Sequence, residues 1–178
     1  MKLGMESFAY RWAIGRLYYR PKDPMDVHAL IDQCVRFKLH AVLLCNNIEL
    51  HTLSDSQILE IKEHLDKEKV DVEVGARGVD QEYFKRMLEI CHLLGAKILR
   101  VGWDMDRTTN LDKQVQNGIE TMKKLMQIAN AYGVEIGIEN TKVITIQEVK
   151  AIIEGVNVPH FGAVIDTCNS SCFITPTE

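Results

Sequence analysis

The sequence predicts an α/β fold in which parallel strands alternate with helices that cover the sheet. Six short apolar runs recur along the 178 residues, and segments with the apolar spacing of helices lie between them. The repeat is roughly the thirty residues that a strand–helix–strand unit requires. Strands that are apolar throughout are typical of a parallel sheet with both faces covered. We expect one domain over residues 1–178.

Branched apolar residues mark the strands. The clearest is Ala41–Cys45, which has no polar residue, and the weakest is the first, near Leu3-Gly4-Met5. In chain order, the predicted strands cover residues 3–5, 41–45, 70–75, 97–101, 134–139 and 161–166.

Caps and apolar stripes mark the helices between these runs. Pro24, with Asp23 as its cap, fits the first position of a helix that runs to about Phe37. Capping boxes that begin at Ser54 and Thr145 open the second and fifth helices. The third and fourth helices are capped by Asp80 and Asn110, and the last three end at Gly95, Gly133 and Gly155.

Two arrangements fit this order of elements, a (β/α)8 barrel and an open doubly wound sheet. No glycine-rich phosphate loop follows the first strand, which weakens the dinucleotide-binding version of the open sheet. A barrel typically needs ~250 residues, and Thr175-Pro176-Thr177-Glu178 has the pattern of a helix start. We therefore favour a barrel truncated to about six units, with its C-terminal part missing, over a complete six-stranded fold.

Composition argues against nucleic acid, a membrane and export as settings for this chain. The net charge is −4 and no cluster of lysine and arginine offers a basic face. No apolar run reaches the ~18 residues that cross a bilayer, and residues 1–12 lack the features of a signal peptide. Cysteines are odd in number and scattered, so we expect reduced thiols in a cytoplasmic protein. They are Cys34, Cys45, Cys91, Cys168 and Cys172.

Two acidic residues stand at the ends of neighbouring predicted strands. Glu139 ends the fifth strand and Asp166 the sixth, so a parallel sheet would bring both to its carboxyl edge. Two hard oxygen ligands placed one strand apart suit Mg²⁺ or Mn²⁺. Structural alternatives exist, since Glu139 could cap the next turn and Asp166 could form an Asx-turn with Asn169. We favour metal binding because the two residues occur together.

Four segments of the chain resemble the xylose isomerase-like TIM barrels, and the likeness runs over its whole length. They are VGARG at 74–78, LGAKILRV at 94–101, IENT at 138–141 and VIDTCNS at 164–170. That superfamily includes sugar and sugar-phosphate isomerases and epimerases, inosose dehydratases, decarboxylases of oxidised sugars and the AP endonuclease group of DNA repair enzymes.

The resemblance implies that Glu139 and Asp166 are the first two of four metal ligands, with Glu139 also the catalytic base. The other ligands, from a seventh and an eighth strand, have no counterpart here. The implied cofactor is Mn²⁺ or Mg²⁺, with Zn²⁺ or Co²⁺ as alternatives. The implied function is a divalent-metal-dependent sugar, sugar-phosphate or keto-sugar isomerase or epimerase that acts through a metal-stabilised enediolate.

Alternatives to this function remain open. A metal-dependent lyase or decarboxylase of an oxidised sugar would use the same scaffold. Residues 1–178 alone would be a catalytically incomplete fragment that binds Mn²⁺ weakly and turns over little sugar. An AP endonuclease-type nuclease is disfavoured, because many family members carry a histidine where this chain has Asn169. Asn169 can instead hydrogen-bond a sugar hydroxyl.

Other polar and aromatic residues follow the predicted strands and are candidates for substrate binding. Asn46 follows the second strand, Arg77 the third and Trp103 the fourth, while Tyr10 and Trp12 lie in the loop after the first. Aromatic rings stack on sugar faces, and arginine binds a carboxylate or phosphate through two hydrogen bonds. Arg77 could equally form a surface salt bridge, and Trp103 could fill the barrel mouth.

Two further expectations concern structure. Glu73 and Arg100 are expected to form a buried structural ion pair inside the barrel. A small-molecule carbohydrate is the expected partner, with no nucleic acid and no membrane. Unpaired sheet edges favour a homo-oligomer.

Overall fold

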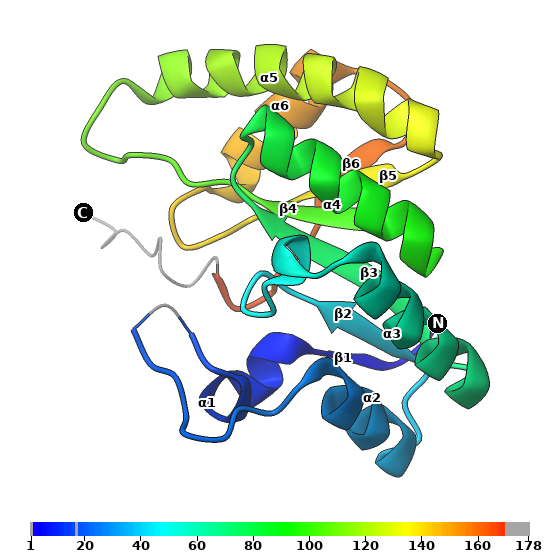
Figure 1. The fold of residues 1–178 in the computed structure, drawn as a ribbon. Helices are drawn as coiled ribbons and strands as arrows, with labels where there is room; N and C mark the ends of the chain where they lie inside the picture. The colour runs from blue at the N-terminus through cyan, green and yellow to red at the C-terminus, as the bar shows by residue number, and fades with distance from the viewer. Residues whose placement is uncertain (1, 17, 170–178) are drawn as a thin grey trace.

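One sheet of six parallel strands organises the chain, as the computed structural model of residues 2–16 and 18–169 shows (Figure 1). The strands lie in chain order and this order never reverses, whereas a doubly wound sheet reverses its order partway. The strands are β1 (Gly4–Glu6), β2 (Ala41–Leu44), β3 (Asp71–Arg77), β4 (Ile98–Gly102), β5 (Glu135–Glu139) and β6 (Phe161–Val164). Cys172 and the predicted helix start at 175–178 lie outside the described residues.

Five helices, α2 to α6, pack along one face of the sheet (Figure 1). Each connects two neighbouring strands, and this repeated crossover in one direction produces the curved sheet of a barrel. The helices are α1 (Arg11–Ile14), α2 (Val27–Arg36), α3 (Asp55–Glu68), α4 (Gln81–Leu94), α5 (Leu111–Tyr132) and α6 (Ile146–Val156). Two 3₁₀ turns, η1 (Ser7–Tyr10) and η2 (Leu50–Thr52), complete the described elements.

The hydrophobic core lies between the sheet and these helices. Alternate residues of each strand point to it, for example Val74 and Ala76 of β3, which are fully buried. The predicted stripe of α4 is confirmed, because Phe84, Met87 and Leu88 are all buried against the sheet. The opposite face of the sheet, which corresponds to the barrel interior, is where polar residues such as Arg100 lie.

Helix ends follow the predicted caps with two corrections. Both capping boxes, at Ser54 and Thr145, are confirmed. The first long helix begins at Val27 and not at Pro24, because the Asp26 side chain accepts a hydrogen bond from the Ala29 backbone N–H at 2.8 Å.

The fifth predicted helix, α6, runs through Gly155 to Val156 and is capped by Asn157. Asn157 adopts the left-handed conformation with φ 48°, which asparagine tolerates better than most residues. A side chain at Gly155 would collide with Ile119 of α5, so this glycine serves the close packing of α6 on α5.

The segment after β1 was expected to be a loop but is partly helical. Tyr10 ends η1 and Trp12 lies in α1, two elements too short to leave a periodic signal in the sequence. In the part of the chain that the structure describes, no helix combines the length and the apolar character needed to span a membrane.

Removal of the Phe84 side chain tests the packing of α4 on the sheet. Phe84→Ala is expected to lower the free energy of unfolding by about 3–5 kcal/mol, because it leaves a cavity in a fully buried site. Urea denaturation followed by circular dichroism measures this. Leu59→Ala, at a position 44% exposed, is the control and should cost less than about 0.5 kcal/mol. Equal losses in the two variants would contradict the assigned core.

Candidate active site at the carboxyl edge of the sheet

Loops that follow all six strands line one cavity at the carboxyl edge of the sheet. Its volume is about 590 Å³, within the range of small-molecule sites. Because parallel strands all end at this edge, residues far apart in the sequence meet there. The polar lining includes Glu6, Asn46, Arg77, Asp104, Glu139, Asp166 and Asn169.

Glu139, the last residue of β5, is a buried carboxylate that faces this cavity. Only 8% of the residue is exposed. Its Oε2 accepts a hydrogen bond from Arg100 Nη1 at 2.7 Å. Burial raises the pKa of Glu139, the charge of Arg100 and its hydrogen bond lower it, and the charges of Asp166 and Glu6 raise it again. The net result is a pKa above the ordinary value, as expected of a carboxylate suited to proton transfer.

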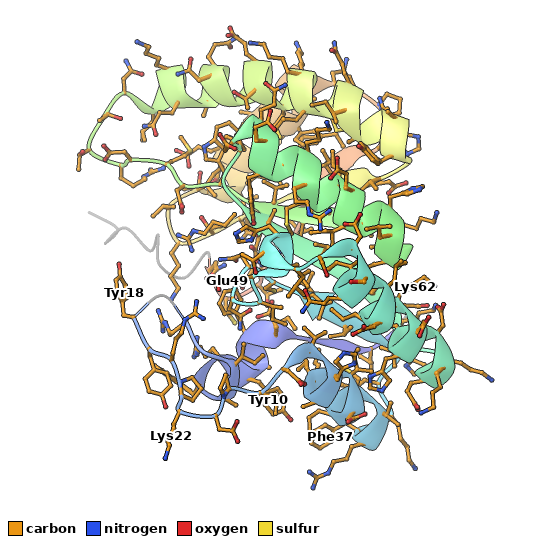
Figure 2. All side chains as sticks on the ribbon, viewed as in Figure 1. Tyr10, Tyr18, Lys22, Phe37, Glu49 and Lys62 are labelled. Atoms are coloured by element: carbon orange, nitrogen blue, oxygen red, sulfur yellow. The ribbon has the colours of Figure 1, made fainter. Side chains whose placement is uncertain are left out.

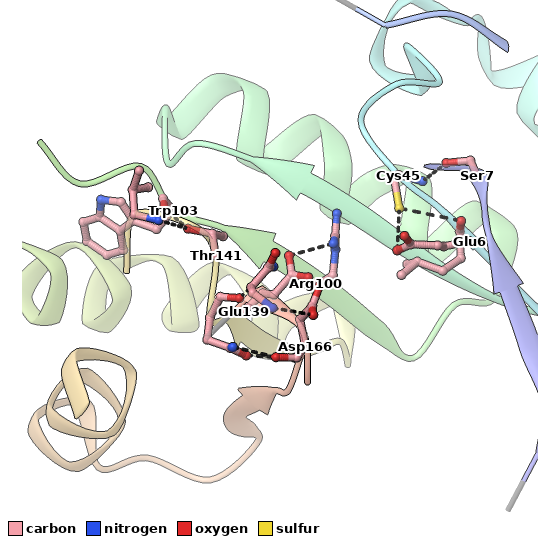
Figure 3. Close-up of polar contacts among 12 residues, drawn as sticks. Glu6, Ser7, Cys45, Arg100, Trp103, Glu139, Thr141 and Asp166 are labelled. Atoms are coloured by element: carbon pink, nitrogen blue, oxygen red, sulfur yellow. Dashed lines mark hydrogen bonds and ion pairs between the residues drawn. The ribbon is translucent and has the colours of Figure 1, made fainter. Parts of the chain in front are cut away.

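Arg100 lies at the floor of the cavity, and the residue opposite it on β3 is Gly75. A Cβ on Gly75 would lie 3.2 Å from both Nε and Nη2 of Arg100, so the glycine leaves room for the guanidinium. Figure 3 shows Arg100 between Glu139 on one side and Glu6 with Cys45 on the other. Its buried Nε has no hydrogen-bond partner among the described residues.

The predicted ion pair of Glu73 with Arg100 is wrong, because Arg100 pairs with Glu139. Strand register explains the difference. Arg100 lies opposite Gly75 on β3 and Gly137 on β5, so Glu139 is two residues further along the same face in the direction of the cavity. Glu73 is two residues before Gly75, toward the amino edge of the sheet.

Asp166 is fixed by hydrogen bonds from its own turn and from β5. Its Oδ1 accepts from the backbone N–H groups of Cys168 at 2.7 Å and Asn169 at 3.0 Å, which is the Asx-turn expected as the structural alternative. The Asn140 side chain donates to the Asp166 carbonyl and accepts from its N–H, both at 2.8 Å. Oδ2 makes no hydrogen bond to a described residue.

Glu6, which sequence reasoning missed, is a third carboxylate at this edge. It ends β1, lines the cavity, and its Oε2 lies 3.8 Å from Cys45 Sγ. Burial raises the pKa of the Cys45 thiol to about 11, so this thiol stays protonated. The rule that singled out Glu139 and Asp166, an acidic residue at a strand end, applies to Glu6 as well, but its strand is short and weakly marked.

The remaining candidates divide into those that reach the cavity and those that the structure places elsewhere. Asn46, Arg77 and Asn169 line it. Arg77 donates two hydrogen bonds to Asp104, at 2.9 and 2.7 Å, and Asn169 Nδ2 donates to the Asn140 carbonyl at 3.0 Å.

Three aromatic candidates are absent from the described lining of the cavity. The Trp103 ring packs on Gly118 of α5, where a Cβ would come within 2.5 Å of the indole. The Tyr10 hydroxyl lies 3.4 Å from Gln33 Oε1. Trp12 is 59% exposed and contacts the Tyr19 ring edge-on.

The carboxylate oxygens at this edge are of the chemical type that divalent cations bind. The described residues hold no group of three or more His, Cys, Asp or Glu side chains arranged for a metal ion. Glu139 and Asp166 offer two carboxylates from adjacent strands, and such hard oxygen donors match Mg²⁺ or Mn²⁺. Cys34, Cys45 and Cys91 are buried thiols that form no disulfide, as predicted for these three, whereas Cys168 is an exposed thiol that lines the cavity.

Comparison with known proteins agrees with this architecture. The family described as xylose isomerase-like TIM barrel matches residues 31–175. The chain belongs to this family. The predicted resemblance and the predicted barrel fold are thereby confirmed.

Solved structures with this barrel fold cover most of the chain. D-psicose 3-epimerase from Clostridium cellulolyticum H10, solved with D-tagatose, is 18% identical with a TM-score of 0.75, and the match covers 96% of this chain and 65% of that one. The IolI protein, solved with a zinc atom, is 18% identical with a TM-score of 0.69, covering 96% and 64%. A 3-keto-D-glucoside 4-epimerase from E. coli is 14% identical with a TM-score of 0.69, covering 96% and 70%.

The 3-oxo-isoapionate decarboxylase of Pectobacterium atrosepticum is similar in sequence to this chain. It is 18% identical over 169 residues, which are 95% of this chain and 59% of the relative. The chain thus spans about three fifths of that protein's length. The proteins that are similar to this chain include sugar epimerases and a decarboxylase of one superfamily.

Substitution of Arg100 tests the buried ion pair. Arg100→Met is expected to lower the free energy of unfolding by about 3–5 kcal/mol at neutral pH, because it leaves the Glu139 carboxylate buried without its partner. The pKa of Glu139 in the folded chain then rises further above its ordinary value of 4.5. A carboxyl group whose pKa is higher in the folded state favours folding only while protonated, so the loss should grow as pH rises above that value.

Urea denaturation across a pH series measures this loss. Arg100→Met combined with Glu139→Gln is the control and should recover part of the stability, because no buried charge remains. An equal loss in the single and double variants at every pH would show that the two residues are not coupled.

Proposed function

We propose that this chain supplies the acid–base centre of a divalent-metal-dependent isomerase or epimerase that acts on a sugar or a sugar phosphate. The observation that carries this proposal is the buried Glu139 carboxylate, which lines the cavity beside Asp166 with a raised pKa. Similar proteins named as sugar epimerases support it. Because the chain spans only part of their length, the activity of the whole protein belongs to the proposal.

Isomerisation and epimerisation of a sugar begin when a proton leaves the carbon next to a carbonyl group. Glu139 is our candidate for the base, since burial makes it bind a proton more readily than a carboxylate in water. Arg100 holds its Oε2, which leaves Oε1 for the proton. Return of the proton by Glu139 to a neighbouring carbon would give an isomer, whereas an epimer would require a second acidic group to deliver a proton to the opposite face of the same carbon.

Glu139 and Asp166 are the residues that would hold the cation. A bound divalent cation supplies Lewis-acid stabilisation of negative charge on the sugar oxygens. Asn46, Arg77 and Asn169, which line the same cavity, are our candidates for contacts to the sugar hydroxyls or to an acid group. Arg100 positions Glu139 and does not itself transfer a proton.

Decarboxylation of a keto-sugar acid is the second candidate function. The similarity to 3-oxo-isoapionate decarboxylase favours it, as do the four arginines among the residues that line the cavity, which could bind an acid group. The site would then stabilise the charge left when carbon dioxide departs, so Glu139 would donate a proton and not remove one.

Mn²⁺ titration tests the predicted ligands. Glu139→Gln and Asp166→Asn are each expected to weaken Mn²⁺ binding at least about tenfold, because each replaces a carboxylate by a weaker ligand. Calorimetry or the electron paramagnetic resonance of free Mn²⁺ measures the affinity. Glu73→Gln is the matched control, since Glu73 is an acid on the same face of the sheet at its opposite edge. Binding that survives Glu139→Gln unchanged would show that the ion sits elsewhere.

Exchange of hydrogen in D₂O tests the proposed chemistry. We expect Mn²⁺-dependent incorporation of deuterium next to the carbonyl of a ketohexose or its phosphate, detected by NMR, and a fall of at least about 100-fold in Glu139→Gln. Label accumulates over hours, so slow turnover is detectable. Release of carbon dioxide from a keto-sugar acid without exchange would favour the decarboxylase, and exchange that persists in Glu139→Gln would exclude Glu139 as the base.

A further inference from the structure

A smaller pocket adjoins the main cavity beneath the loop that follows β1. Its volume is about 210 Å³, and it shares Phe8, Arg16, Asn46 and Arg77 with the lining of the cavity. In Figure 2 the loop that carries Tyr18 and Lys22 extends on the same side of the molecule as Glu49. The polar residues of this side pocket are Arg16, Arg20, Arg77, Asn46, Asn47 and Glu49.

The charge of the side pocket opposes that of the whole chain. Three guanidinium groups line it against the single carboxylate of Glu49, whereas the chain carries a net charge of −4. Arg20 pairs with Glu49 at 2.8 Å and Arg77 pairs with Asp104 at 2.7 Å, so Arg16 carries the positive charge that no described carboxylate offsets. A concave site lined by one sign of charge attracts ligands of the opposite sign.

Arg77 is oriented so that one edge of its guanidinium remains for a ligand. Nε and Nη2 both donate to Asp104, and this two-point contact fixes the plane of the group. Nη1 makes no hydrogen bond to a described residue, and Arg77 lines the side pocket. Asp104 therefore acts as an anchor and leaves Nη1 as a donor.

Arg16 is held in place by the backbone and by Trp12. Its N–H and carbonyl both bond to Tyr19, at 2.8 Å each, which closes a tight turn. Gly15, with φ +117°, allows this turn, because a side chain there would be strained. The Arg16 guanidinium lies 5.6 Å from the centre of the Trp12 ring, a cation–π distance. Trp12 thus positions an arginine in this structure.

Asn47 adds an amide whose orientation is fixed. Ser7 Oγ donates to Asn47 Oδ1 at 2.5 Å, and Asn47 Nδ2 donates to the Ser7 carbonyl at 3.3 Å. The backbone N–H of Cys45 donates to the same Ser7 Oγ at 2.9 Å. The second N–H of the Asn47 amide is then a donor in a fixed place at the side pocket.

We propose that the side pocket binds the ionised acid group of the substrate, a carboxylate or a phosphate, through Arg16, Arg77 and Asn47. Guanidinium groups with fixed planes recognise such groups through paired hydrogen bonds. The substrate is therefore a sugar acid or a sugar phosphate and not a neutral sugar. The placement of the substrate's carbonyl end near Glu139 rests on the proposed function, whereas binding of the acid group in the side pocket does not.

Titration with inorganic phosphate, without added metal and at low ionic strength, tests this pocket. We expect saturable binding by calorimetry that Arg16→Gln and Arg77→Gln each weaken about tenfold, the loss typical of a charged hydrogen bond. Lys142→Gln is the control, because Lys142 lines only the main cavity. Asp104→Asn should bind phosphate at least as well as the parent, which separates loss of charge at the pocket from general damage around Arg77.

Gluconate and fructose 6-phosphate, titrated in the same way, distinguish the two acid groups, since the preferred class binds more tightly and shows the same losses. Phosphate binding that Glu139→Gln leaves unchanged would support the pocket whether or not Glu139 is a base. The proposal is overturned if phosphate does not bind, or if binding is equal in the parent, Arg16→Gln and Arg77→Gln. A larger loss in Lys142→Gln than in these two variants would also overturn it.

Discussion

A single buried cation, the guanidinium of Arg100, is the interaction on which the acidic edge of the sheet depends. Charges on Glu6 and Asp166 both oppose ionisation of Glu139, and burial leaves little water to screen them. Arg100 offsets this repulsion from the cavity floor, with Gly75 leaving the space that its guanidinium occupies. Three acidic groups can therefore lie at one edge of a folded sheet.

The kinds of charged side chain differ between the main cavity and the side pocket that adjoins it. In the main cavity, Glu6, Glu139 and Asp166 lie near Arg100, whereas the adjoining side pocket is lined by Arg16, Arg20 and Arg77 with one carboxylate, Glu49. If both proposals hold, the negative end of a substrate would lie toward the arginines of the side pocket and its reactive end toward Glu139, because a site lined by one sign of charge attracts the opposite sign.

Local signals account for what the sequence predicted well. Composition and caps mark the strands β2 to β6 and the helices α2 to α6. Because parallel strands share an edge, Glu139 and Asp166 could be assigned to one place. The partner of Arg100 could not be predicted from the sequence, because it depends on the strand register. This register sets Arg100 opposite Gly137 and is a long-range property of the fold. Glu6 was missed because three residues of β1 leave too short a run to mark a strand end.

The reciprocal hydrogen bonds between Asn140 and the Asp166 backbone tie the tip of β6 to that of β5. Asn140 directly follows Glu139 in the chain, so these hydrogen bonds hold the backbone of Asp166 next to the end of β5. If the two carboxylates hold a cation, as we propose, this backbone tie would limit how far they can adjust to ions of different radius.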